Sequence, residues 1–115
     1  MIVRNLESED VKQGWYVAHG GGLATMLLDS SVLQGILFFA FGVTKPGKAG
    51  EVHMDAYEEI YYLLQGKGII TVGDERREVK AGDAIWLPHG VPHGLENNGE
   101  EDLVMVVTAA MPRPY

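Results

Sequence analysis

The sequence contains no cysteine, and this absence removes several kinds of site at once. Disulfide bonds, zinc sites with thiolate ligands and cysteine nucleophiles all need a thiol. A chain that forms no disulfide also fits a reducing compartment. The residues up to Lys12 mix charges of both signs and lack the apolar stretch of a signal peptide. We therefore expect a cytoplasmic protein.

Long apolar runs and positive charges are also scarce. The longest apolar run extends from Ile36 to Phe41, far short of the ~18 residues needed to cross a membrane. Nine lysines and arginines stand against sixteen aspartates and glutamates, which gives a net charge of −7. Nucleic acids and anionic membranes are bound by basic surfaces. We therefore expect neither as a partner, and an anionic ligand would have to be held by a local feature.

Glycine, by contrast, is abundant. The 15 glycines among 115 residues are about twice the usual share of roughly 7%, and most segments between them are too short for helices of ~10–12 residues. Several segments are rich in Val, Ile, Tyr and Phe, which favours strands. The sequence predicts an all-β sandwich or barrel with strands at 13–18, 23–28, 32–43, 51–55, 59–64, 68–72, 76–79, 84–87, 94–96 and 103–108. Residues 1–12 fit either a strand or a helical turn.

Histidine and carboxylate residues gather around one of these segments. His53 and Asp55 are two positions apart, so on a strand their side chains share a face. Glu59 follows after a short turn and begins the next predicted strand. If these two strands pair, an imidazole and two carboxylates converge on an inner face, where burial without partners is costly. A divalent cation would compensate them.

A second histidine follows a stiff loop. Residues 88–92 include two prolines and a glycine, and His93 comes directly after them. Such a lead-in holds a side chain in place without reorganisation, which is what a metal ligand needs. His19, beside three glycines, is expected to be a hydrogen-bonded structural residue.

Two spaced motifs resemble those of the cupin superfamily. The first consists of Gly47, His53, Asp55, Glu59 and Gly66. The second consists of Gly82, Pro88, Gly90, His93 and Asn97. The resemblance implies one cupin domain over residues 1–115, folded as a double-stranded β-helix or jelly-roll barrel. It would comprise an N-terminal arm and first strand (1–22), the motifs at 47–66 and 82–97, and a tail (111–115).

The resemblance also implies a metal site inside the barrel, with His53, Glu59 and His93 as ligands of one divalent ion per chain. The family usually has a second histidine where this sequence has Asp55. Two histidines and one carboxylate suit non-haem Fe(II), and a fourth ligand at Asp55 would favour Mn or Fe over Cu. Zn and Ni are further candidates. Alternatively, Asp55 orients a metal-bound water or His53.

Two aromatic residues could take part in a pocket. Tyr61 shares a strand face with Glu59, so we expect its hydroxyl to line the pocket as a catalytic group that orients substrate or donates a proton. Trp86 is expected in the core rather than beneath a substrate.

The fold alone does not determine function, and three hypotheses remain open. The first is a metal-dependent enzyme of the dioxygenase, decarboxylase or isomerase type, acting on a small polar or carbonyl compound; with redox chemistry it would be an oxidoreductase. The second is a non-catalytic cupin that binds or senses a small-molecule ligand. The third is a dimeric scaffold with a vestigial metal site, which would leave buried ionisable groups unpartnered. The apolar segment 32–43 and open strand edges predict a homodimer.

Overall fold

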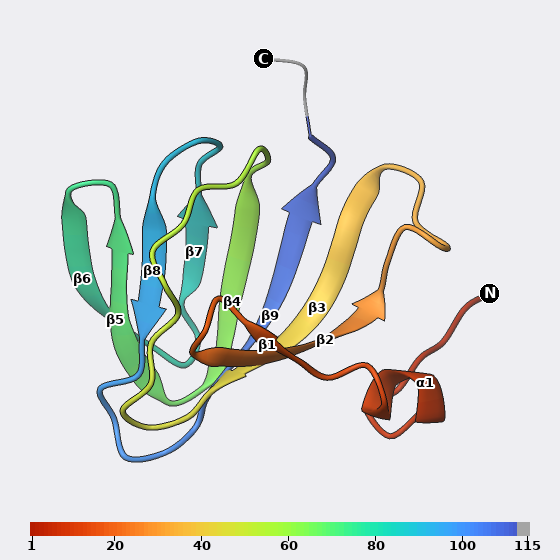
Figure 1. Ribbon diagram of the computed structural model, residues 1–115, viewed down its shortest axis with the longest axis horizontal. Helices are drawn as coiled ribbons and strands as arrows, with labels where there is room; N and C mark the ends of the chain where they lie inside the picture. Colours follow the sequence, from red (N-terminus) through yellow and green to blue (C-terminus); the bar gives the residue numbers. More distant parts are fainter. Residues whose placement is uncertain (113–115) are drawn as a thin grey trace.

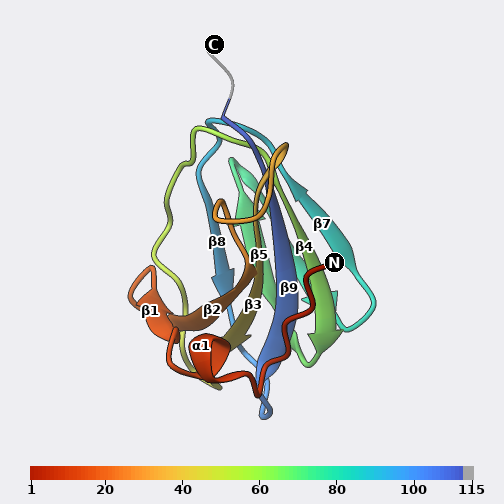
Figure 2. The ribbon, with the colours of Figure 1, turned by 90° about the vertical axis from the view of Figure 1, so that its right-hand side faces the viewer.

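A computed structural model, which describes residues 1–112, contains two antiparallel β-sheets that face each other (Figure 1, Figure 2). The larger sheet has six strands in the order β1-β2-β3-β9-β4-β7, and the smaller has three in the order β6-β5-β8. The elements are α1 (Glu9–Lys12), β1 (Tyr16–Ala18), β2 (Gly22–Leu28), β3 (Ile36–Thr44), β4 (Glu59–Gln65), β5 (Lys67–Val72), β6 (Glu75–Lys80), β7 (Ala84–Leu87), β8 (His93–Glu96) and β9 (Leu103–Ala110). Pairing of strands distant in sequence, such as β3 with β9, is typical of a jelly roll. The predicted all-β barrel is therefore confirmed.

The N-terminal part differs from the expected strand limits. A single helical turn, α1, forms where the sequence allowed strand or helix, and the carbonyl of its buried Val11 accepts a hydrogen bond from the Thr25 hydroxyl at 2.8 Å. Strand β3 begins at Ile36 instead of residue 32. The reason is that the carbonyl of Asp29 accepts the amides of Val32 and Leu33 at 3.0 and 2.9 Å, which prolongs the preceding turn. The tail predicted over 111–115 lies, from residue 113, outside the described residues.

The prediction of a strand at residues 51–55 is wrong. This segment contacts β8 in one isolated bridge, His53 with His93, and Ala49 just before it forms another with Glu96; neither stretch pairs with β4. Its exposed Val52 and Met54 face away from the barrel at 63% exposure each. The segment therefore runs beside β8 as an extended loop, visible in yellow-green in Figure 1.

The core lies between the two sheets and follows the alternation of the strands. On β4 the odd positions Glu59, Tyr61 and Leu63 are buried, whereas Ile60 and Tyr62 are exposed. This is the period of two that a strand imposes on its side chains. The inward-facing apolar side chains form one cluster, which includes Ala40, Tyr61, Leu63, Ile70, Val79, Leu87, Leu95, Leu103 and Val107.

Asn97, the last residue of the second motif, is a structural residue. Its side chain is 1% exposed. Its amide nitrogen donates to the carbonyls of Thr44 and Glu101, both at 2.8 Å, and its amide oxygen accepts the Gly99 N–H at 2.8 Å. Buried polar groups need such partners. Asn97 thereby joins the end of β3 to the loop that leads into β9.

Candidate metal centre

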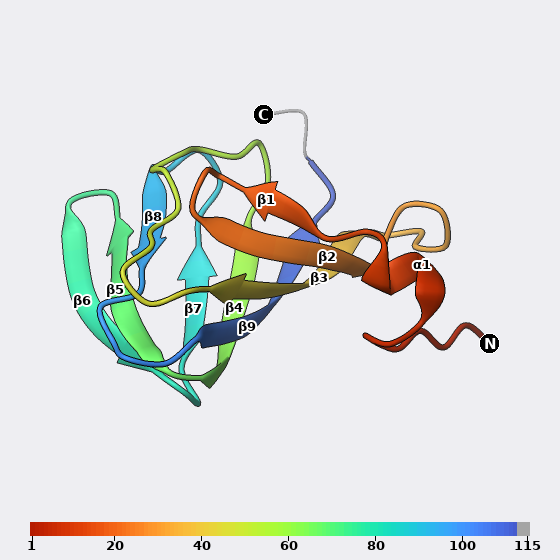
Figure 3. The same cartoon turned by 60° about the horizontal axis from the view of Figure 1, so that its bottom comes forward.

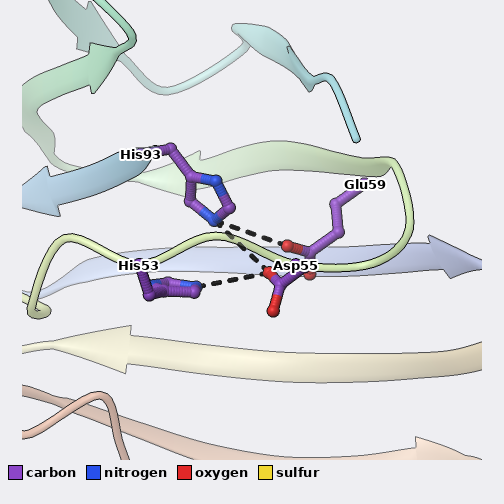
Figure 4. A group of neighbouring side chains, drawn as sticks. All are labelled: His53, Asp55, Glu59 and His93. Carbon is purple, nitrogen blue, oxygen red and sulfur yellow. Dashed lines mark ion pairs between the residues drawn. The ribbon is translucent and has the colours of Figure 1, made fainter. Parts of the chain in front are cut away.

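The four side chains predicted as ligands come together between the two sheets (Figure 4). His93 begins β8 in the smaller sheet, and His53 is bridged to it by two backbone hydrogen bonds of 3.0 and 2.9 Å. Glu59 begins β4 in the larger sheet, where it pairs with Leu87 and Ala109. Asp55 lies on the segment that connects the two sides. The cluster therefore forms because the two sheets face each other. The sequence had instead suggested that the strands carrying His53 and Glu59 pair side by side.

The distances within the cluster suit a single metal ion. One ligand atom from each residue can be chosen so that all four lie within 4.8 Å of one another. Asp55 Oδ2 lies 3.4 Å from His53 Nε2 and 3.6 Å from His93 Nε2, and Glu59 Oε1 lies 3.5 Å from His93 Nε2. Ligands that each stand about 2.1 Å from a central ion are roughly 3.0–3.5 Å apart when adjacent. The group therefore needs only small adjustments to surround a cation.

Three atoms of this cluster are buried without a hydrogen-bond partner: His53 Nε2, His93 Nε2 and Glu59 Oε1. Such atoms carry the full cost of desolvation unless something binds them. The other ring nitrogens are engaged, because His53 Nδ1 lies 2.9 Å from the Glu51 carbonyl and His93 Nδ1 lies 3.3 Å from the Val91 carbonyl. A carbonyl only accepts hydrogen bonds, so Nδ1 carries the proton in both rings. The Nε2 atom of each ring is left facing the cluster, where it could bind a metal.

The electrostatics of the cluster also call for a cation. Burial raises the pKa of Glu59 to about 8, and the neighbouring Asp55 carboxyl adds to this rise. Burial lowers the pKa of His93, and the nearby His53 lowers it further. His93 is therefore neutral at pH 7. Once Glu59 gives up its proton, its carboxylate, that of Asp55 and the Nε2 atoms of His53 and His93 would form a donor set for Fe, Mn, Zn or Ni.

His19 belongs to this site, and the sequence interpretation missed it. Its ring stacks on that of His53, with centroids 3.5 Å apart and planes 12° from parallel. The β1–β2 hairpin that carries His19 lies across one end of the barrel (Figure 3), where the His19 carbonyl accepts the Glu51 amide at 2.7 Å. Gly21 permits this docking, because a Cβ there would overlap the Ala49 carbonyl. No residue pattern in the sequence marks this contact.

A pocket of about 100 Å³ opens beside the cluster, and His53 and Glu59 form part of its wall. Tyr61 also lines it, with its ring edge-on to His93 at a centroid distance of 6.2 Å. Burial, followed by the charges of Glu59 and Asp55, strongly raises the pKa of Tyr61. Its hydroxyl is therefore a proton-bearing hydrogen-bond donor at neutral pH.

Two other aromatic residues differ from expectation. Trp86 is 60% exposed on the outer face of the larger sheet, where its indole N–H donates to Glu58 at 3.0 Å. The prediction that it lies in the core is therefore wrong. Burial, followed by the charges of Asp55 and Glu59, raises the pKa of Tyr57, which the sequence did not single out as a site residue. Its hydroxyl therefore stays protonated at neutral pH.

Comparisons with known proteins match this chain to one protein family. The family model for the cupin domain, Cupin_2, matches residues 41–109. An uncharacterized protein of Methanocaldococcus jannaschii is 32% identical over 99 residues, covering 84% of this chain and 79% of that protein. The oxalate-binding protein of Thermotoga maritima is 32% identical over 82 residues, covering 70% of this chain and 68% of that protein.

Solved structures agree with this match. The crystal structure of a predicted oxalate decarboxylase from Thermotoga maritima superposes with a TM-score of 0.82. It is 26% identical in sequence, and the match covers 96% of this chain and 99% of that one. Across residues 1–112, helical structure nowhere reaches the length and apolar character that a membrane crossing requires.

Proposed function

The chain belongs to the cupin domain family, and we propose that it is a small metal-dependent enzyme of the dioxygenase, decarboxylase or isomerase type. One divalent ion per chain would be held by His53, Asp55, Glu59 and His93. The observation that carries this proposal is the convergence of three buried, unpartnered ligand atoms on one point. A vestigial site would have no reason to keep these costly groups.

The residues of the site have separate tasks in this proposal. A bound divalent ion polarises a substrate oxygen and, where it is iron or manganese, also exchanges electrons. His53 and His93 present fixed Nε2 atoms because backbone carbonyls hold their Nδ1 protons. Tyr61 donates a hydrogen bond from the pocket wall to the substrate. The apolar wall around it keeps bulk water from the reacting groups.

A second candidate function is binding or sensing without catalysis. The relative from Thermotoga maritima is named an oxalate-binding protein, which favours small-molecule capture at a comparable site. The two candidates share the metal centre and differ in whether substrate turns over. Both predict a small-molecule partner.

Elemental analysis tests the shared part of the proposal. Protein purified without a polyhistidine tag or chelators should carry about one equivalent of Fe, Mn, Zn or Ni. Glu59→Gln should lose most of it, whereas Glu58→Gln should retain it, because Glu58 is hydrogen-bonded to Trp86 on the outer face. A wild-type protein that takes up no metal on reconstitution contradicts the proposal.

We also propose that the chain forms a homodimer through the outer face of the larger sheet. Ile60, Tyr62, Leu64 and Trp86 lie there with 44–60% of their surface exposed, and Ile60 is paired with Trp86 across β4 and β7. On the smaller sheet, β6 instead exposes charged side chains. Exposed apolar side chains that gather on one face in this way are typical of a subunit interface. Light scattering should give a dimer, and Tyr62→Lys a monomer; a monomeric wild type at micromolar concentration contradicts this.

A further inference from the structure

Negatively charged groups outnumber positively charged ones around the pocket. If Asp55 and Glu59 both bind a divalent ion together with two neutral histidines, the centre has a formal charge of zero. The exposed Glu51 adds a carboxylate at the pocket wall. Within the described residues, the lining of this pocket includes no lysine or arginine. The charge of the bound ion would therefore already be offset by the two carboxylates. An anionic ligand would find no further positive charge in the pocket lining.

The wall of the pocket is apolar. Phe38, Ala40, Met105 and Val107 form much of it. The volume of about 100 Å³ is smaller than the engineered cavity of ~150 Å³ that admits benzene in another protein. Only a compound of a few heavy atoms or one small ring, partly outside the pocket, can be held there. Entry strips water from the ligand, which costs a carboxylate far more than an uncharged group.

From this charge and lining we infer that the site takes small uncharged compounds that carry one oxygen donor on an apolar body, such as a phenol or a ketone, and discriminates against dicarboxylates. The inference rests on the proposed metal site and specifies its substrate class. It separates this chain from the relative whose name refers to oxalate. Asp55 and Glu51 are the residues that set the preference: Asp55 through the charge of the centre, Glu51 through the charge of the wall.

Ligand binding to zinc-loaded protein tests the inference, with phenol and oxalate as the two probes. Zinc content is first measured, and is measured again after dialysis against each probe. We expect phenol to bind at least tenfold more tightly than oxalate in an NMR titration while zinc is retained. Oxalate binding as tightly as phenol or more tightly, with zinc retained, overturns the inference but leaves the metal site intact. Failure to take up zinc overturns the metal site and the inference with it, and binding of neither probe overturns the inference.

Two variants test the cause of the preference. Asp55→Asn keeps the shape of the side chain and removes one negative charge. In the variant with its zinc content measured and found equal to that of wild type, the ratio of oxalate affinity to phenol affinity should rise at least tenfold. Glu51→Gln, which does not alter the cluster, should give a smaller rise. Glu100→Gln removes the same charge from an exposed residue outside the pocket lining and should change neither affinity. An unchanged ratio of the two affinities in both Asp55→Asn and Glu51→Gln contradicts the assigned roles.

Discussion

Strand β4 passes through two different halves of the barrel interior. At its start, Glu59 is 5% exposed among ionisable groups that lack hydrogen-bond partners, and four residues later Leu63 is 0% exposed among apolar ones. Tyr61 stands between them with an apolar ring and a polar hydroxyl. Strand β8 in the opposite sheet repeats this order, with His93 followed by Leu95.

The two halves contribute differently to the molecule: the apolar half stabilises the fold, and the polar half contains the candidate metal site. The apolar half gains free energy from burial, roughly 25 cal/mol per Å² of apolar surface removed from water. The polar half costs free energy unless a partner such as the proposed cation binds it, because its unpartnered atoms have lost their water. Substitution in the apolar half should therefore mainly lower stability, and substitution in the polar half should mainly lower metal affinity.

The largest effect is expected in the apolar half. Leu63→Ala should lower the free energy of unfolding by about 2–5 kcal/mol, because it leaves a cavity in a fully buried position. Denaturant titration of the metal-free protein measures this. The metal content of the folded variant should stay at the wild-type level; a loss of metal would show that the two halves are not separate.

The next effect belongs to the polar half. His93→Ala should weaken metal binding by at least about 100-fold, since loss of a ligand exceeds the 10–100-fold cost of altering a ligand's hydrogen-bond partner. Competition with a chelator measures the affinity. The metal-free variant should lose less stability than Leu63→Ala, because removal of the unpartnered Nε2 offsets part of the cost of the cavity and of the lost Nδ1 contact with Val91. A loss of stability as large as that of Leu63→Ala would contradict the contrast.

The pH dependence of the metal-free protein gives a third, smaller effect. The pKa of Glu59 rises on folding to about 8, so the folded state holds this proton more tightly than the unfolded state. The contribution of this proton is complete below the ordinary carboxyl range and is lost as pH increases through about 8. Stability should therefore decrease across that range, and Glu59→Gln should flatten the profile. Urea titrations from pH 4 to 9 test this; an equal slope in wild type and variant counts against it.

The smallest effect is expected at His19, whose ring stacks on that of His53 in the polar half. His19→Ala removes a stack on His53 worth about 0.5–1.5 kcal/mol, so metal should dissociate roughly two- to tenfold faster. His19→Phe keeps a flat ring and should restore the wild-type rate, which stopped-flow transfer to a chelator records. Equal rates in all three proteins would show that the stack does not hold His53 in place.

Much of the fold and the cluster could be predicted from the sequence, because local patterns report on local geometry. The glycine spacing and strand composition indicated the barrel, and the positions of His53 and Glu59 in one motif and of His93 in the other indicated their convergence. The sequence did not reveal that they reach each other from opposite sheets, since pairing between distant strands leaves no local pattern. Trp86 was placed wrongly because in a strand as short as β7 either phase of alternation buries a large apolar side chain. His19 was missed because its contact depends on how a hairpin docks, which only the folded chain determines.

Glu51, in the wall of the pocket, joins the β1–β2 hairpin to His53 through its backbone alone. The amide of Glu51 donates to His19 and its carbonyl lies 2.9 Å from His53 Nδ1, so neither contact depends on which side chain position 51 carries. Position 51 is therefore open to mutation in a way that positions 53 and 59 are not. Related proteins can change the charge at the pocket wall there in a single step and leave the ligand geometry intact, which makes position 51 an accessible route by which this barrel could acquire a new substrate.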